Sequence, residues 1–411
     1  MDLTEVLSYY HAMEGFLGCV PARIGHCKTV DAAACAVVKA FRHTALRPGS
    51  AQDVATRLHY AADLSYVKAV SRLRLALAGT EPRQDYGDSS ILSAALLVIA
   101  DKARKVPYDG HVDGITTLLL THNRDQTPTP LARGVMYWHV LGTFQTPTAR
   151  GEASPFESDA WLEAVDLTAK DPEPAVRRLS TIGNQLYIRL PRLVALVRAA
   201  RVTASDVKAS AEATALASTI LGLDDSLAES EMLHTVRVTK TSDPSDAHMV
   251  PFSFSFPTPG HFLCATKYWQ NRLLLNRLCL RLQELLETQS LLPPRPPKHP
   301  FNTERIRTEN LRLATNIMMC AQYTFRLFAL GSHGLRIALI ALWAMTKDLG
   351  REFRKGLPTA DVRTWTLQRF NDLHRVRSVY AESQMDDAAE LLAGGPLKGF
   401  LLDVLLKAPI V

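Results

Sequence analysis

Apolar residues recur at every third or fourth position along most of this chain, and this spacing limits its fold more than any other feature. The longest regular run follows His261, where leucines at positions 275, 278, 282 and 285 recur with a 3-4-3 spacing. Such spacing places apolar side chains on one face of a helix. The polar side chains between them are expected to face solvent, and they are Arg272, Asn276, Gln283 and Glu287.

Other segments carry the same pattern. Residues 91–99 predict a helix that turns one apolar face toward a core. Residues 175–201 predict a longer helix, with a break or kink near Leu190 because Pro191 lacks an amide hydrogen and crowds the preceding turn. Residues 335–345 are apolar nearly all round, which is typical of a buried helix. A last stripe consists of Leu313, Ile317, Cys320 and Leu327.

Two stretches interrupt the helices. In the loop-like stretch 239–260, residues 252–256 alternate phenylalanine and serine between two prolines. We expect an extended segment that lays three phenylalanine rings on a helical core, rather than a sheet. The second stretch, 291–302, is proline-rich and predicts an extended spacer, although it also resembles an SH3-type ligand. We find no fixed repeat, so the expected fold is one all-α domain over residues 1–411.

The composition is that of a globular protein. Apolar residues make up 47% and charged residues 21% of the 411 positions, enough to bury a large core. With 47 basic and 41 acidic residues, the net charge is +6, which is modest for a dedicated nucleic-acid binder. The six cysteines include no C-x-x-C pair, so reduced, intracellular thiols are expected. The sequence shows no signal peptide and no membrane-length apolar run, which predicts a soluble protein with no membrane contact.

Motifs of several enzyme classes are missing. We find no H-E-x-x-H, G-x-S-x-G, G-x-G-x-x-G or P-loop pattern, and we expect neither a metal nor a cofactor. Terpene cyclases are also all-α and hold Mg²⁺ on two acidic helices. The acidic stretches 224–229, 371–375 and 386–390 approximate their motifs. Their spacing or order differs, and Arg375 would repel the metal, so this interpretation is disfavoured.

Five short motifs follow one another between roughly residues 5 and 360. They are an early helix with Tyr66, Ala69 and Leu73; a hairpin at 91–123 with Asp101, His111 and Gly114; a Leu-Pro turn at 190–193; a helix at 265–282 with Tyr268 and Trp269; and a later helix with Asn316 and Tyr323. Their order resembles the regulatory region of fungal zinc binuclear cluster transcription factors, in which glutamate is usual at the position of Asp101. The resemblance implies an all-α regulatory domain that controls transcription, often of a biosynthetic or catabolic gene cluster.

That family normally carries a six-cysteine zinc cluster ahead of this region. The chain begins almost at the regulatory region, and Cys19, Cys27 and Cys35 do not have the cluster spacing. The resemblance therefore implies a truncated member, or a piece of a longer factor, without specific DNA binding of its own. Its expected partner is a DNA-binding transcription factor or coactivator, in a homo- or heterodimer, with a small-molecule effector as a further candidate. The expected location is the nucleus, with the cytoplasm as the alternative, and the helix at 269–287 is the candidate docking surface.

Two other functions stay open. A truncated family member inside a gene cluster could have become a biosynthetic enzyme, with a ligand pocket between helices lined by His111, Trp138, Tyr268 and Trp269. Core packing is the simpler interpretation of these four residues. The chain could also be a decoy that dimerises with a full-length factor and blocks it.

Overall fold

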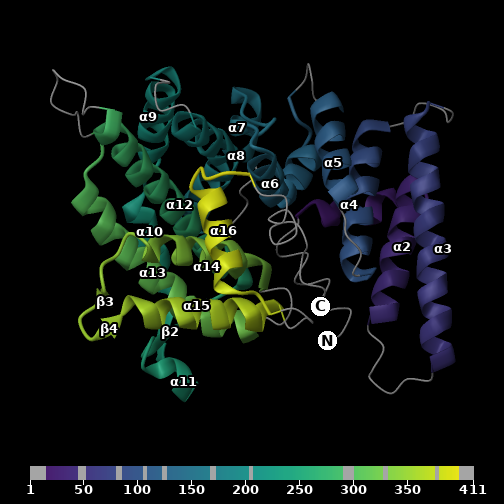
Figure 1. The fold of residues 1–411 in the computed structure, drawn as a ribbon. Coiled ribbons are helices and arrows are strands. Elements are labelled where there is room, and N and C mark those ends of the chain that lie inside the picture. Colours follow the sequence, from purple (N-terminus) through teal and green to yellow (C-terminus); the bar gives the residue numbers. More distant parts are fainter. Residues whose placement is uncertain are drawn as a thin grey trace. The chain divides into compact units, whose positions relative to one another are not determined.

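The computed structural model describes residues 15–44, 52–79, 86–104, 109–122, 127–166, 173–202, 207–289, 300–326, 332–374 and 379–397. These residues are essentially all-α, as the spacing of apolar residues predicts (Figure 1). No helix within these ranges has both the length and the apolar character of a bilayer-spanning segment. The chain forms two compact units, of which unit 1 comprises residues 1–142 and 158–168 and unit 2 comprises residues 143–157 and 169–409. The expectation of a single domain stays a prediction, and each unit is described by itself.

Unit 1 is built around α2 and α4. Helix α2 packs against α3 and α4, and α4 packs in turn against α3 and α5. The predicted apolar face at 91–99 is buried in the core, and because α4 has neighbours on several sides, the other residues from Ile91 to Ala100 are buried as well. The elements are η1 (Gly15–Cys19), η2 (Pro21–Arg23), α2 (Lys28–Thr44), α3 (Gln52–Leu77), α4 (Tyr86–Arg104), α5 (Asp109–His122), the first part of α6 (Pro130–Arg150) and α7 (Asp159–Asp166).

Unit 2 is built around α12, which packs against α8, α9, α13 and α14. Helices α15 and α16 pack against α14, and α10 packs against α8. The helices are α8 (Pro174–Val202), α9 (Val207–Leu221), α10 (Ser226–Thr235), α11 (Pro244–Ala247), α12 (Pro259–Gln289), α13 (Thr303–Arg326), α14 (Ser332–Thr346), α15 (Thr359–His374) and α16 (Glu382–Leu392). The strands are β1 (Arg237–Lys240), β2 (Phe252–Ser255), β3 (Glu352–Arg354) and β4 (Leu357–Pro358).

Most of the polar side of α12 does not face solvent. Arg272, Asn276 and Gln283 are buried and only Glu287 is exposed, so the prediction of a wet face was wrong for three of its four residues. The prediction of a docking surface at 269–287 was wrong for residues 269–280, all of which are buried. Instead, these polar groups are paired inside unit 2. Asn276 donates to Asn310 on α13 over 2.9 Å, and Arg272 donates to Glu309 over 2.9 Å. Spacing along one helix does not reveal neighbours on its second side, because those neighbours come from distant parts of the chain.

Helix α8 runs unbroken through Pro191 from Pro174 to Val202, so the predicted break is wrong. Leu190, directly before the proline, and Leu193, two positions after it, are fully buried. Burial of such side chains on both sides offsets the loss of one backbone hydrogen bond. The α8–α12 contact is close at Gly183, whose carbonyl accepts a 3.0 Å hydrogen bond from Asn271.

The predictions for α13 and α14 are confirmed. Leu313, Ile317 and Cys320 are buried on α13, and every residue from Leu335 to Met345 is buried on α14. Two sequence features lie outside the described residues, namely Leu327 and most of the proline-rich connection 291–302, of which only positions 300–302 are described.

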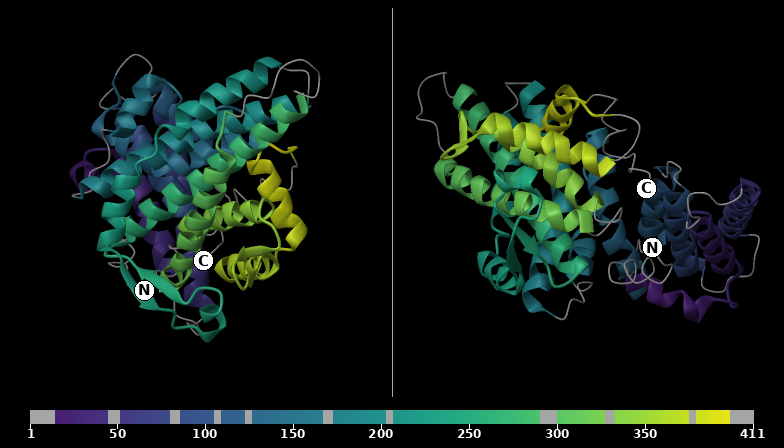
Figure 2. Two further views of the ribbon diagram at one scale, coloured as in Figure 1. Left: turned by 90° about the vertical axis from the view of Figure 1, so that its left-hand side faces the viewer. Right: turned by 90° about the horizontal axis from the view of Figure 1, so that it is seen from below.

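The stretch 239–260 contains a β-hairpin. Strand β2 pairs antiparallel with β1, with Val238 opposite Phe254, so the expectation of an unpaired extended segment was wrong (Figure 2, teal arrows). Phe254 and Phe256 are buried, but Phe252 is 48% exposed, so two rings rather than three cover the core. Side chains two residues apart lie on the same face of a strand, so all three rings share one face, and the exposed ring is the one at the first residue of β2.

Candidate functional site

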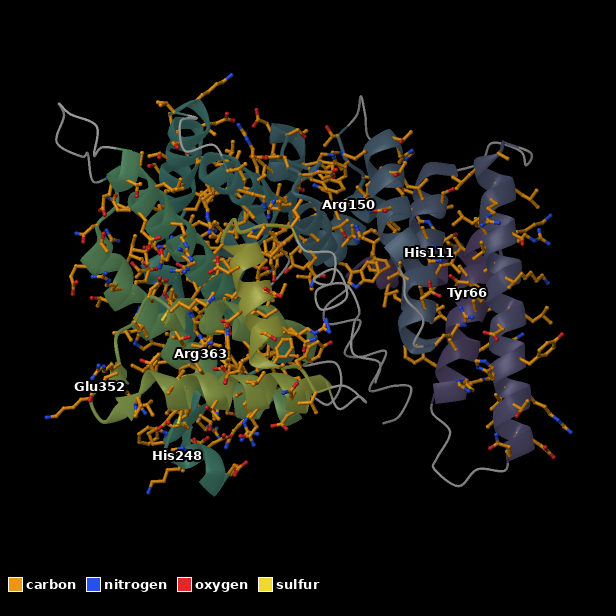
Figure 3. The ribbon with its side chains drawn as sticks, in the orientation of Figure 1. Tyr66, His111, Arg150, His248, Glu352 and Arg363 are labelled. Atoms are coloured by element: carbon orange, nitrogen blue, oxygen red, sulfur yellow. The ribbon has the colours of Figure 1, made fainter. Side chains whose placement is uncertain are left out.

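Three polar side chains from three helices of unit 1 meet at one point. The hydroxyl of Tyr66 on α3 donates to Oδ2 of Asp101 on α4 over 2.9 Å. The same hydroxyl makes a short contact with Nε2 of His111 on α5, and that Nε2 lies 3.2 Å from Oδ2 of Asp101. Figure 3 labels Tyr66 and His111 beside each other. Because the tyrosine proton is directed at Asp101, the contact with His111 is satisfied when Nε2 carries the imidazole hydrogen.

An arginine holds this group from the side. Nη1 of Arg104 donates to Oδ1 of Asp101 over 3.2 Å, and Nη2 donates to Oδ1 of Asp63 over 2.6 Å. The guanidinium carbon of Arg104 lies 4.1 Å from the centre of the Tyr66 ring, in cation–π geometry. We call these five residues, Asp63, Tyr66, Asp101, Arg104 and His111, the Tyr66 cluster. It links α3, α4 and α5 through hydrogen bonds, ion pairs and ring contacts.

Burial sets the protonation states in the Tyr66 cluster. The Asp101 side chain is 2% exposed, and this burial raises its pKa to about 6, although the hydrogen bond from Tyr66 and the charge of Arg104 oppose the rise. Burial, together with the charge of Arg74, lowers the pKa of His111. Burial and the neighbouring Asp101 raise the pKa of Tyr66. Near neutral pH, the cluster therefore holds a neutral imidazole, a protonated phenol and a carboxyl group close to its own titration point.

This arrangement can move or bind a proton, or hold a small polar ligand. The side chains of Asp63 and His111 are 39% and 24% exposed, whereas that of Asp101 is 2% exposed, so solvent reaches the cluster at Asp63 and His111. Perturbed pKa values of this kind gather at functional sites, but structural ion-pair networks perturb them as well. The geometry makes the Tyr66 cluster the candidate functional site of unit 1.

The pKa of Asp101 predicts that the stability of unit 1 depends on pH. An unfolded aspartate ionises near pH ~3.9, whereas folded Asp101 has a pKa of about 6. Between these values the folded chain binds more protons than the unfolded chain, so the free energy of unfolding contributed by this carboxyl falls as the pH rises. Since Asp101→Asn removes the titration, the stability advantage of wild type over the variant should decline across this window in urea unfolding. A flat or rising difference, or a ¹³C carboxyl titration midpoint far below 6, would contradict this account.

The four residues predicted to line a pocket lie in different surroundings. His111 belongs to the Tyr66 cluster in unit 1, and Trp138 packs against Phe16 in the same unit with ring centres 5.3 Å apart. Tyr268 and Trp269 are buried in unit 2. The role of these four residues as pocket residues stays a prediction. The structure itself shows polar contacts for His111, Tyr268 and Trp269, and ring packing for Trp138.

A second polar network lies inside unit 2 around α12. The hydroxyl of Tyr268 donates to Asp224 over 2.7 Å, and Nε1 of Trp269 donates to Glu229 over 2.7 Å. Glu229 also pairs with Arg312 on α13. Burial and the neighbouring Asp224 raise the pKa of Tyr268, so its hydroxyl keeps its proton. A surface hollow of about 440 Å³ lies beside this network, and it is lined by Asn302, Glu304, Arg305, Thr308, Glu309 and Arg312.

The acidic residues that approximate a cyclase motif have separate roles. Asp225 caps α10 by accepting from the amide of Ala228 over 2.8 Å, while Asp224 and Glu229 accept from Tyr268 and Trp269. Within the described ranges, no three histidine, cysteine, aspartate or glutamate side chains converge as they would around a metal ion.

The sequence marks parts of both networks but does not show that they meet. Tyr66, Asp101 and His111 are separate motif positions, and no sequence motif marks Arg104 or Asp63. A charged residue directly after the apolar run 91–100 is the signal that points to Asp101. Comparison with models of protein families, with curated proteins and with solved structures finds no match for this chain.

Proposed function

We propose that this chain regulates transcription by acting on a protein partner, with the Tyr66 cluster as its control point. The proposal rests on the motif order that resembles fungal zinc binuclear cluster transcription factors. One observation carries it further. Asp101 and His111 are motif positions that lie 35 and 45 residues after Tyr66, and the three side chains meet in one hydrogen-bonded group. A shared contact supports the view that these positions belong to one functional unit.

The Tyr66 cluster suits a regulatory role because it joins three helices. A proton or small polar ligand that binds Asp101 or His111 alters the contacts of Tyr66 and Arg104, which lie on two different helices. Such a ligand favours one helix arrangement only if its affinity differs between the arrangements. In this mechanism, the arrangement of α3, α4 and α5 determines whether the partner binds.

The test replaces the genomic copy with Tyr66→Phe, which removes the shared hydroxyl and keeps the ring. Transcripts of neighbouring genes should fall to the level of a full deletion if the cluster controls the regulator. Thr117→Val is the control, because it removes an exposed hydroxyl from α5 of the same unit, outside the Tyr66 cluster. Transcripts that are unchanged in the deletion strain would contradict the regulatory function itself.

A gel shift tests the partner dependence. The purified chain should not retain promoter DNA with sequence specificity, because its mechanism requires a partner to contact DNA. Sequence-specific retention by the chain alone would overturn this part of the proposal.

A biosynthetic enzyme is the second candidate, and the Tyr66 cluster is the observation that favours it. A carboxyl group with a pKa of about 6, beside an imidazole and a phenol, is suited to acid–base chemistry near neutral pH. The two functions differ in what a deletion does. Intact transcripts with an accumulating pathway intermediate would favour the enzyme, whereas loss of the transcripts would favour the regulator.

A further inference from the structure

Helix α3 carries an apolar stripe that no other part of the described chain covers. Tyr60, Leu64 and Val67 are 68%, 58% and 60% exposed. The buried side of the helix is opposite, and it consists of Ala62, Ser65, Ala69, Leu73 and Ala76. Within unit 1, α3 lies at the outer edge, with α2 and α4 on its inner side (Figure 1).

The spacing distinguishes this stripe from scattered surface residues. Single exposed apolar side chains are normal on any protein. Here the steps are four residues from Tyr60 to Leu64 and three from Leu64 to Val67, which is the spacing of a helix-pairing seam. Tyrosine is also among the residues enriched at the energetic centres of interfaces. The outer face of α3 therefore has the pattern of a surface that receives another helix.

Basic residues flank the stripe. Arg57, Lys68 and Arg74 are all exposed. At about 100° per residue, Lys68 and Arg74 fall on opposite sides of the line through Leu64. Helix α3 has two acidic residues. Asp63 is paired with Arg104 of the Tyr66 cluster, and Asp53 lies in the first turn of the helix. The rim of the stripe is thus mainly positive.

We propose that α3 binds an amphipathic helix of a partner protein whose apolar seam is flanked by acidic residues. This deepens the proposed function and rests on it, since it names the chemistry of the partner. A second copy of the chain fits less well. In an antiparallel pairing centred between Leu64 and Val67, Arg57 of each copy would lie opposite Arg74 of the other, and like charges disfavour that contact. An anionic membrane also fits less well, because the stripe is narrow and has no tryptophan or phenylalanine.

The probes are two synthetic 21-residue helical peptides with the same leucine seam, one flanked by glutamate and one by lysine. Fluorescence anisotropy with the full chain should show binding of the glutamate peptide, weakening with added salt, and little binding of the lysine peptide. The double variant Leu64→Glu/Val67→Glu should lose about tenfold or more in affinity, as expected when central anchors are lost. Leu227→Glu is the matched control, because this leucine is 65% exposed on α10 of unit 2, and it should leave the affinity unchanged.

Charge reversal provides the sharper test. The variant Arg57→Glu/Lys68→Glu should bind the glutamate peptide more weakly and the lysine peptide more tightly than wild type. A loss of folding would not produce this exchange of preference.

Equal binding of the two peptides by wild type, or no effect of Leu64→Glu/Val67→Glu, would overturn the proposal. Two further results would also overturn it. One is a wild-type dimer in sedimentation that Leu64→Glu/Val67→Glu abolishes, and the other is stripe-dependent binding to phosphatidylserine vesicles. The peptide assay makes no use of transcription, so its failure is distinguishable from unchanged transcripts in the deletion strain.

Discussion

Replacing Asp246 with alanine is expected to destabilise unit 2 by about 3–5 kcal/mol, the usual cost of removing one partner from a buried ion pair. Oδ1 of Asp246 accepts a 2.7 Å hydrogen bond from Nε1 of Trp365 and pairs with the guanidinium of Arg369. The side chains of Asp246 and Arg369 are 4% and 9% exposed. Arg369 keeps pairs with Asp243 over 3.6 Å and with Asp372 over 3.0 Å, but Asp246 is its one buried carboxylate among these three. Urea unfolding, with hydrogen exchange of α12 as the reporter of unit 2, measures the loss.

The matched control is Asp372→Ala. Asp372 pairs with the same arginine over 3.0 Å, but its side chain is 40% exposed, against 4% for Asp246. Since solvent screens this pair, its removal should have only a small effect. Equal losses for the two variants would contradict the argument that burial, rather than contact with Arg369, determines the cost.

Glu229→Ala is expected to destabilise unit 2 by about 3 kcal/mol. The carboxylate is buried and accepts from the indole N–H of Trp269, which is fully buried, so the variant leaves that donor without this acceptor. We expect a smaller loss than for Asp246 because Arg312, the other partner, is 46% exposed and can be rehydrated. Glu229→Gln keeps an acceptor near Trp269 and should recover part of the stability in the same urea unfolding.

Glu231→Ala serves as the control for Glu229. It lies on the same helix, and its pair with Arg178 is exposed on both sides, so little change is expected. A comparable loss in both variants would mean that the helix itself, rather than the Trp269–Glu229 contact, had been damaged.

The candidate site illustrates how far sequence reasoning extends. His111 was identified as a candidate, and Tyr66 and Asp101 were identified as motif positions, but nothing in the sequence placed them within hydrogen-bond distance. Their contact depends on how α3, α4 and α5 pack, and that packing arises from apolar residues elsewhere on these helices. The same limit applies to Trp269, whose acceptor Glu229 comes from a stretch that suggested metal ligands when considered alone.

The spacing of apolar residues was sufficient to predict the all-α class and the helices around residues 91–99, 175–201, 261–287 and 335–345, because this periodicity is a local property of each segment. Tertiary structure alone decided which polar side chains are buried. The leucine spacing along α12 predicts that Arg272 and Asn276 face solvent, yet α13 supplies Glu309 and Asn310 as their hydrogen-bond partners. The strand pairing of residues 252–255 likewise required β1, and the unbroken course of α8 through Pro191 accompanied burial of Leu190 and Leu193. In each case the deciding energy comes from groups distant in sequence, whose proximity a local pattern does not encode.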